Sequence, residues 1–238
     1  HHTWDELEPS VIRGPAAALM LHECVMQGED LTGTEMPGPD PLELPLVLQD
    51  WEPDYALAVY RAAGGDFPSP EPGPLETLPE GAPAKPFRDP ESISALLHLV
   101  HAWTNGSTGE AVAVAVDGDA RSAIALIEPG EVRVGAISGA DAMAWMAWAA
   151  ASGGSHGRRR GAATGRLDAW HALGAIAGFE QWPVDPDALG EALAHLRWYR
   201  WEPMRGADGW ALFLAVEDPE TNEAWAIAAH DPPAADPP

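Results

Sequence analysis

The sequence predicts an α+β protein: an antiparallel sheet, made of a three-stranded meander and a C-terminal hairpin, that is packed by helices on one face. Two observations carry this prediction. Strand patterns and helix patterns come in separate runs along the chain, and this order is typical of α+β folds. Turn sequences such as Asp117–Gly118 and Asp218–Pro219 separate neighbouring strand patterns, which indicates hairpins and therefore an antiparallel sheet.

The predicted core domain, residues 89–230, begins with a helix. Asp89–Pro90 supplies a cap and a first-turn proline, and apolar side chains recur at helical spacing through Ile93–Trp103. Ser138 and Asp185 are further caps that precede helix patterns. The later helices are expected at Ala140–Ala151, Ala162–Gly178 and Asp185–Arg197. The strands are expected at Glu110–Val116, Arg121–Ile127, Glu131–Ile137, Trp198–Glu202, Gly209–Glu217 and Glu223–Ala229.

The region before this domain, residues 3–88, is acidic and rich in proline, and it is expected to be organised differently. Two short helices are predicted, Pro15–Gln27 and Asp54–Ala63, each followed by glycine. Eight prolines from Pro68 to Pro90 remove backbone donors, so this stretch is expected to run as an extended arm over a surface. The polar, proline-rich tail 231–238 is expected to be disordered.

The chain is strongly acidic: 37 Asp and Glu stand against 13 Lys and Arg, and the formal net charge is −24. Direct binding to nucleic acid or to an anionic membrane rests on Lys and Arg, so this balance argues against both. No apolar run reaches the roughly 20 residues of a membrane span. The single cysteine, Cys24, cannot form an internal disulfide, and the cytoplasm is the expected location. Solubility, adaptation to high salt and mimicry of a nucleic-acid backbone stay open as reasons for the acidity.

The segment Ser152–Arg166, here called the Gly/Arg segment, is the stretch that most resembles a binding site. Glycines let backbone N–H groups approach a ligand, arginines match phosphate or carboxylate groups, and a helix is expected to begin nearby. These features predict an anion-binding loop. Two other interpretations stay open: an internal clamp, in which the arginines pair with acids of the protein itself, and a surface that docks a partner. The candidate anion-binding residues are Gly153, Gly154, Gly157, Arg158, Arg159, Arg160 and Arg166.

Other kinds of chemistry have weaker candidates. Asp168 and His171 lie one helical turn apart and could exchange protons, and His156 lies within the Gly/Arg segment. His98 and His101 have a spacing that can place two imidazoles on one metal ion, but no compelling third ligand is evident. A structural role on a helix surface is the simpler explanation for each pair. No cofactor is predicted, and the absence of a recognisable catalytic set favours a protein that is not an enzyme.

Several short blocks resemble an uncharacterised actinobacterial family of unknown function. They are Ser152–Gly161 with Gly165–Arg166, Trp182–Pro186, Leu196–Tyr199 and Glu217–Pro219. The resemblance covers about residues 89–232 and excludes the proline-rich N-terminal region. It implies a source, which the preference for Arg over Lys also fits, and it implies no activity and no catalytic residue.

Three functions are compatible with these observations. The first is a non-catalytic acidic interaction module that engages a protein partner or a second copy of itself, and that docks an anionic group at the Gly/Arg segment. The second is an enzyme or sensor that binds a phosphorylated small molecule or nucleotide at the same segment. The third is a nucleic-acid mimic. Arginines that converge on an open concavity would favour the second function, whereas arginines paired with carboxylates of the protein would count against it.

Overall fold

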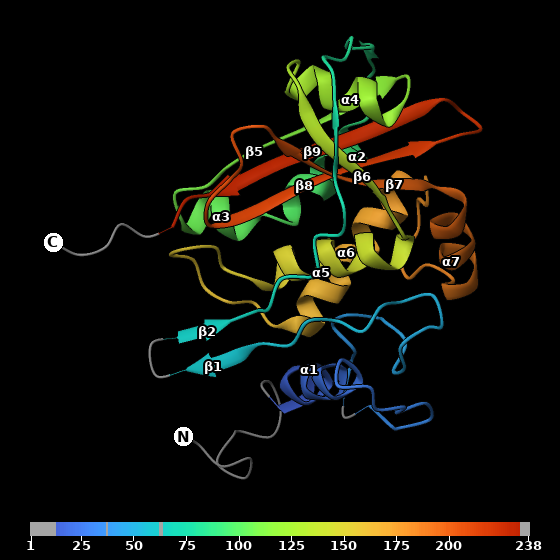
Figure 1. Ribbon diagram of the computed structural model, residues 1–238. Helices are drawn as coiled ribbons and strands as arrows, with labels where there is room; N and C mark the ends of the chain where they lie inside the picture. Colours follow the sequence, from blue (N-terminus) through green and yellow to red (C-terminus); the bar gives the residue numbers. More distant parts are fainter. Residues whose placement is uncertain (1–12, 37, 62–63, 234–238) are drawn as a thin grey trace, which may run out of the picture.

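The structure is a computed structural model, and it describes residues 13–36, 38–61 and 64–233. A seven-stranded antiparallel sheet forms its centre, with the strand order β3–β6–β7–β8–β9–β5–β4 (Figure 1). The helices are α1 (Arg13–Val25), α2 (Pro90–His98), α3 (His101–Gly106), α4 (Ala120–Ile127), α5 (Gly139–Ala151), α6 (Ala162–Ile176) and α7 (Pro186–His195). The strands are β1 (Val59–Arg61), β2 (Gly64–Asp66), β3 (Glu76–Leu78), β4 (Lys85–Pro86), β5 (Glu110–Asp117), β6 (Val132–Ile137), β7 (Arg197–Pro203), β8 (Trp210–Asp218) and β9 (Glu223–Asp231).

The hairpin of β8 and β9 lies near the middle of the sheet. Its two strands pair from Trp210↔Asp231 to Asp218↔Glu223, across the turn that the sequence predicts. β5 pairs along its whole length with the other side of β9, and β7 followed by β6 extends the sheet beyond β8. The α+β class and the antiparallel sheet with its C-terminal hairpin are confirmed.

Alternation along the strands gives the sheet two apolar faces. Leu214 and Trp225 belong to the larger hydrophobic cluster, which also contains residues of α2, α5 and α6; this is the inner face. Ala215 and Ala226 belong to a smaller cluster with residues of α4; this is the outer face. Figure 1 shows α4 on the side of the sheet opposite α5 and α6. The sheet is therefore covered by helices on both faces and not on one.

The stretch Arg121–Ile127 is helical, and its prediction as the middle strand of a meander is wrong. Asp119 caps this helix, α4, by accepting a hydrogen bond from Ser122 N at 2.7 Å. Ala123 and Ile124 are buried against the outer face. A short apolar run fits a strand and a helix equally well, and the cap together with burial on a single side decides for the helix. β5 and β6 consequently lie on opposite sides of the sheet centre.

The predicted helix Asp54–Ala63 is also wrong. The chain is extended there, and β1 pairs with β2 in an antiparallel hairpin. Val59 and Tyr60 are residue types that favour strands. Residues 62 and 63 lie outside the described residues. The other predicted N-terminal helix is present as α1, which begins and ends about two residues earlier than expected.

The proline-rich arm covers both edges of the sheet. β3 pairs with β6 at one edge, and β4 pairs with β5 at the other. Between them the chain passes over α4, where Arg121 donates a hydrogen bond to the carbonyl oxygen of Pro79 and Ala84 packs on the outer cluster. Unpaired strand edges invite pairing with other chains, and short strands that contain proline oppose it. The arm thus shields the edges of the main sheet.

The N-terminal region and the predicted core domain share one hydrophobic core. Leu42, Leu44 and Phe67 are buried in the same cluster as α5 and α6. A boundary near residue 88 therefore does not separate two cores. At the other end, β9 extends to the buried Asp231, which the sequence assigns to the tail. Residues 234–238 of that tail lie outside the described residues.

Two glycines of α6 have contrasting surroundings. A β-carbon on Gly165 would lie far inside contact distance of the carbonyl oxygen of Ala147 on α5, whereas a β-carbon on Gly174 would meet Val184 at an ordinary 3.7 Å. Gly165 therefore sets the close approach of α5 and α6.

Gly165→Ala is expected to lower the free energy of unfolding by roughly 1–3 kcal/mol, because the two helices must separate to admit a methyl group. Gly174→Ala is expected to raise it by up to about 1 kcal/mol, because alanine favours the helix and restricts the unfolded chain. Urea unfolding followed by circular dichroism measures both. Equal effects of the two substitutions would contradict the close α5–α6 packing.

Candidate functional site

Arg166 of the Gly/Arg segment is buried in an ion pair with Glu52. The two side chains are 1% and 0% exposed. Nε donates to Oε1 at 2.8 Å and Nη2 donates to Oε2 at 2.6 Å, which is the bidentate geometry of a strong pair. Arg166 also donates to the carbonyl oxygens of Pro45 and Val47, at 2.9 and 3.0 Å. The pair thus fixes the segment 45–52 to α6.

The Glu52 carboxylate receives three more hydrogen bonds. The donors are Gln49 N at 2.9 Å, the Tyr55 hydroxyl at 2.7 Å and Trp170 Nε1 at 2.7 Å. Burial, together with the nearby charge of Glu52, raises the pKa of Tyr55 well above its usual value, so the hydroxyl stays protonated and donates. Buried charged groups are costly unless they are paired and hydrogen-bonded, and both Arg166 and Glu52 are.

Gly154 of the segment lies against a carboxylate that belongs to the protein. Asp231 is fully buried at the end of β9, and it accepts hydrogen bonds from Ser155 N at 2.6 Å and from Thr108 Oγ1 at 3.2 Å. Gly154 has a φ of 66°, and a side chain there would collide with the Asp231 carboxylate. The loop thus donates a hydrogen bond, through Ser155, to a carboxylate of the protein itself.

A carboxylate of the protein also lies at the start of α6. Gly161 precedes the helix with a φ of 99°, and the N–H of Ala163 in the first turn donates to Glu23 Oε1 at 3.1 Å. A helix N-terminus attracts negative charge, and here the charge comes from a side chain of α1.

The remaining arginines of the segment point to different partners. Arg159 lies 5.2 Å from the ring centre of Trp210 and donates to the carbonyl oxygen of Gly154 at 2.7 Å, and Arg158 is exposed. Arg160 forms an ion pair with Asp168. The four arginines therefore do not converge on one open concavity. These contacts correspond to the internal clamp that the sequence leaves open.

Asp168 on α6 lies close to His98 on α2, and both are candidates from the sequence. Besides the ion pair with Arg160, its Oδ1 lies 3.7 Å from Nε2 of His98 on α2. Asp168 is 5% exposed and His98 is 53% exposed, so a buried carboxylate lies behind an accessible imidazole. The packing of α2 on α6 creates this pair, and sequence spacing could not show it. A carboxylate in this position can orient an imidazole for proton transfer.

The titration of this cluster follows from burial. Burial raises the pKa of Asp168, and the charges of Arg160, His98 and His171 act in the opposite direction. Burial lowers the pKa of His171, whose ring stacks on Trp182 with 3.7 Å between ring centres. The negative charge of Asp168 acts against this and raises the pKa of His171, whereas the positive charge of His98 lowers it.

His101 and His156 are not part of the Asp168–His98 pair. His101 stacks on His98, with Nδ1 3.0 Å from the amide nitrogen of Asn105. His156 is exposed, and its backbone N–H donates to the hydroxyl of Ser107 at 3.1 Å. Within residues 13–36, 38–61 and 64–233, no three His, Cys, Asp or Glu side chains are grouped so that they could hold a metal ion. In the same ranges, no helix has the length and apolar character needed to cross a membrane.

A feature that the sequence did not indicate is a hollow of about 850 Å³ on the outer face, here called the outer hollow. It lies beyond the end of α4, where that helix no longer covers the sheet. Trp201 and Phe213, whose rings lie 4.9 Å apart, and the 44% exposed Val112 are among its apolar residues. Together these side chains form an apolar floor in the outer hollow.

The charged residues of the outer hollow are mostly acidic. Glu110, Glu128 and Asp208 line it against Arg205, and His230 is the further titratable residue. Nε2 of His230 bonds to the carbonyl oxygen of Asp208, which ties the loop after β7 to β9. Only the register of the sheet brings these residues together, because they come from β5, the end of α4, the loop after β7, and β9. An apolar floor with carboxylates at its border suits a ligand that is both apolar and cationic.

The chain belongs to a protein family of unknown function, DUF6183, whose model matches residues 1–233. The match includes the proline-rich N-terminal region, so the limit of the sequence resemblance at about residue 89 is wrong. No curated protein and no solved structure matches the chain.

Glu52→Gln and Arg166→Met are each expected to lower the free energy of unfolding by roughly 3–5 kcal/mol, because each leaves one buried charge without its partner. The double variant is expected to lose less than the sum of the two, because no unpaired charge is left. Urea unfolding of the four proteins gives the coupling. Arg158→Gln, at an exposed arginine of the same segment, is the control and should change stability by less than about 0.5 kcal/mol. Strictly additive losses would contradict the clamp.

The pKa of His171 is expected to lie below its usual value of 6.5. Asp168→Asn should lower it further and His98→Gln should raise it, because the two neighbours act in opposite directions. Since the folded pKa is below the unfolded one, the stability contributed by neutral His171 is complete above pH 6.5 and is lost as the pH falls below it. Proton–carbon NMR of the imidazoles measures the titration. Shifts of the same sign in both variants would disprove the arrangement of the cluster.

Proposed function

We propose that the protein is a non-catalytic interaction module that binds a cationic segment of a protein partner in the outer hollow. The observation that carries the proposal is the combination of an apolar floor, with Val112 exposed on it, and a border of Glu110, Glu128 and Asp208. Such a site takes apolar side chains into its floor and pairs Lys or Arg with its border. An amphipathic segment with one apolar and one basic face has both properties.

The charge of the whole chain supports the same kind of partner. A net charge of −24 attracts cations over distances of about a Debye length, ~8 Å at physiological salt, and speeds their encounter. A second copy of the chain carries the same charge, so self-association through this hollow is opposed by repulsion. A basic partner from another chain is therefore favoured over a homo-oligomer. A nucleic-acid mimic would be a special case, in which the basic partner is a DNA-binding protein.

A site for a phosphorylated ligand at the Gly/Arg segment has less support. The guanidinium groups of Arg166 and Arg160 already contact Glu52 and Asp168, and the N–H groups of Ser155 and Ala163 already contact Asp231 and Glu23. An external anion would have to displace these carboxylates or add its charge beside them.

A proton-transfer site at His98 is the second candidate function, and the observation that favours it is the buried Asp168 behind an exposed imidazole. We also propose, from the composition of the chain alone, a cytoplasmic location and an actinobacterial source.

The proposal predicts that a fluorescent amphipathic Leu/Lys peptide binds and that the matching Leu/Glu peptide does not. Glu110→Gln/Glu128→Gln is expected to weaken binding roughly three- to tenfold, because one exposed and one half-buried charge contribute modestly and in a salt-dependent way. Fluorescence anisotropy at two salt concentrations measures the affinities. Val112→Asp, which places a carboxylate on the apolar floor, should weaken binding as well.

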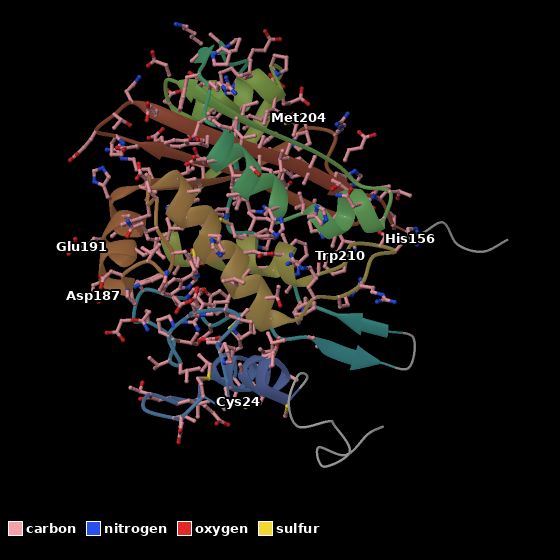
Figure 2. All side chains as sticks on the ribbon, turned by 180° about the vertical axis from the view of Figure 1, so that it is seen from behind. Cys24, His156, Asp187, Glu191, Met204 and Trp210 are labelled. Carbon is pink, nitrogen blue, oxygen red and sulfur yellow. The ribbon has the colours of Figure 1, made fainter. Side chains whose placement is uncertain are left out.

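The matched control is Asp187→Asn/Glu191→Gln on α7. Figure 2 shows both residues at one end of the molecule, away from Met204 in the loop that borders the outer hollow. The control changes the net charge by the same amount, from −24 to −22, at two exposed positions. It should leave the affinity almost unchanged. Equal weakening by both double variants would mean general charge attraction and would overturn the site, as would the absence of binding.

A further inference from the structure

The proline-rich arm covers the outer edge of β5 only at the C-terminal end of that strand. β4 pairs with the last two residues of β5, and the N–H of Phe87 donates to the carbonyl oxygen of Ala115 at 3.1 Å. The arm then turns away, because Asp89 already caps α2. The rest of β5, residues 110–114, is here called the open edge, and Figure 1 shows β5 along the margin of the sheet, next to β9.

The open edge presents backbone groups that have no partner. In an antiparallel ladder, successive residues direct their N–H and C=O groups to opposite sides of the strand. Ala115 bonds to Phe87 and therefore points away from β9, and the same alternation makes Ala113 and Ala111 point away from β9 as well. Within the described residues, no hydrogen bond from that side reaches the backbone of Ala111 or Ala113. Both residues are half-buried, and an additional strand can supply the missing partners.

On the inner side, a groove of about 560 Å³ lies beside the open edge, here called the edge groove. Ala111 lines it from β5, Ile93 and Leu97 line it from α2, and His101 lines it from α3. Ala111 and Ile93 also pack against the inner hydrophobic cluster. Side chains that an added strand directs to the inner face would enter this groove, and its apolar residues favour apolar side chains.

On the outer side, the open edge is continuous with the outer hollow. Glu110 and the 44% exposed Val112 belong to both. Side chains that an added strand directs to the outer face would lie beside Glu110, and a net charge of −24 favours Lys or Arg there. The two sides of the open edge therefore fit an extended segment in which apolar and basic residues alternate.

We infer that the basic partner segment binds in an extended conformation and adds to the sheet as a further strand along the open edge of β5. Its backbone bonds to Ala111 and Ala113, its apolar side chains enter the edge groove, and its basic side chains lie beside Glu110. Addition of a peptide strand to a sheet edge obtains affinity from main-chain hydrogen bonds and specificity from alternate side chains. This inference rests on the proposed function, because it assigns a conformation to the same partner.

The test titrates the full-length protein with short fluorescent Leu/Lys peptides and measures anisotropy. A peptide in which Leu and Lys alternate is expected to bind roughly tenfold more tightly than a peptide of equal composition with Leu at helical spacing, because only alternation directs every Leu to the edge groove. In an added strand only every second N–H points at β5. N-methylation of one alternate set of residues is therefore expected to weaken binding roughly tenfold or more, and N-methylation of the other set to change it less than about twofold. Equal effects of the two methylated sets would overturn the inference.

Ala111→Pro and Ala82→Pro form a matched pair of variants. Proline at position 111 removes an N–H that points away from β9, and edge strands accept proline at such positions. Ala82 lies in an exposed, extended part of the arm, where the same substitution serves as the control. Ala111→Pro is expected to weaken binding of the alternating peptide roughly three- to tenfold, and Ala82→Pro to leave it unchanged. Thermal unfolding verifies the fold of each variant, and unaltered binding by a folded Ala111→Pro variant would contradict the added strand.

The outcomes separate this inference from the proposed function. If no Leu/Lys peptide binds, both fail. If the two peptides bind equally and the position of the methyl groups has no effect, the partner function stands and the strand addition is wrong. Light scattering of the protein alone tests the other occupant of the open edge: a dimer that Ala111→Pro disrupts would mean that a second copy of the chain pairs there, and would overturn the choice of a basic partner.

Discussion

A carboxylate can leave water only if the protein replaces the hydrogen bonds that water gave it, and Glu52 meets that requirement with donors from both halves of the chain. Gln49 and Tyr55 donate from its own segment, whereas Arg166 and Trp170 donate from α6. The proline-rich region can form few backbone hydrogen bonds of its own. Its attachment to the core therefore depends on side-chain contacts of this kind together with the apolar residues buried around them.

The scarcity of basic residues gives this attachment a wider consequence. The chain has 13 Lys and Arg for 37 Asp and Glu, and several of the arginines are used inside the molecule. Arg166 and Arg160 are paired with acids of the protein, and Arg200 and Arg133 share Glu202. Arginines that are paired in this way do not offset the negative charge of the remaining surface acids. The acids on the surface, among them those of the outer hollow, therefore act on partners with little compensation nearby.

Sequence patterns predicted the elements that have strong local signals. Caps at Asp89, Ser138 and Asp185 marked the starts of helices, and all three caps are present. The prediction for Arg121–Ile127 is wrong because its residues suit a strand as well as a helix, and the cap at Asp119 together with burial on one side decides for the helix. For the site, backbone N–H groups and arginines of the Gly/Arg segment contact carboxylates of the protein itself, Asp231, Glu23 and Glu52, which lie far away in sequence. Binding of an external anion there stays a prediction. Nothing in the local pattern could identify these carboxylates, nor could it show that Val112 and Phe213 border a common hollow.

Asp231 links the Gly/Arg segment to the proposed partner surface. It is the last residue of β9, it holds the loop through Ser155, and its neighbours His230 and Pro232 line the outer hollow. Ser155 Oγ donates to the carbonyl oxygen of Pro232 at 2.5 Å, which fixes the chain on the other side of Asp231 as well. One wall of the outer hollow is thus held in place by a loop that does not line it. We therefore expect the Gly/Arg segment to matter for the proposed partner binding without contacting the partner, because Gly154 permits the packing that positions the end of β9.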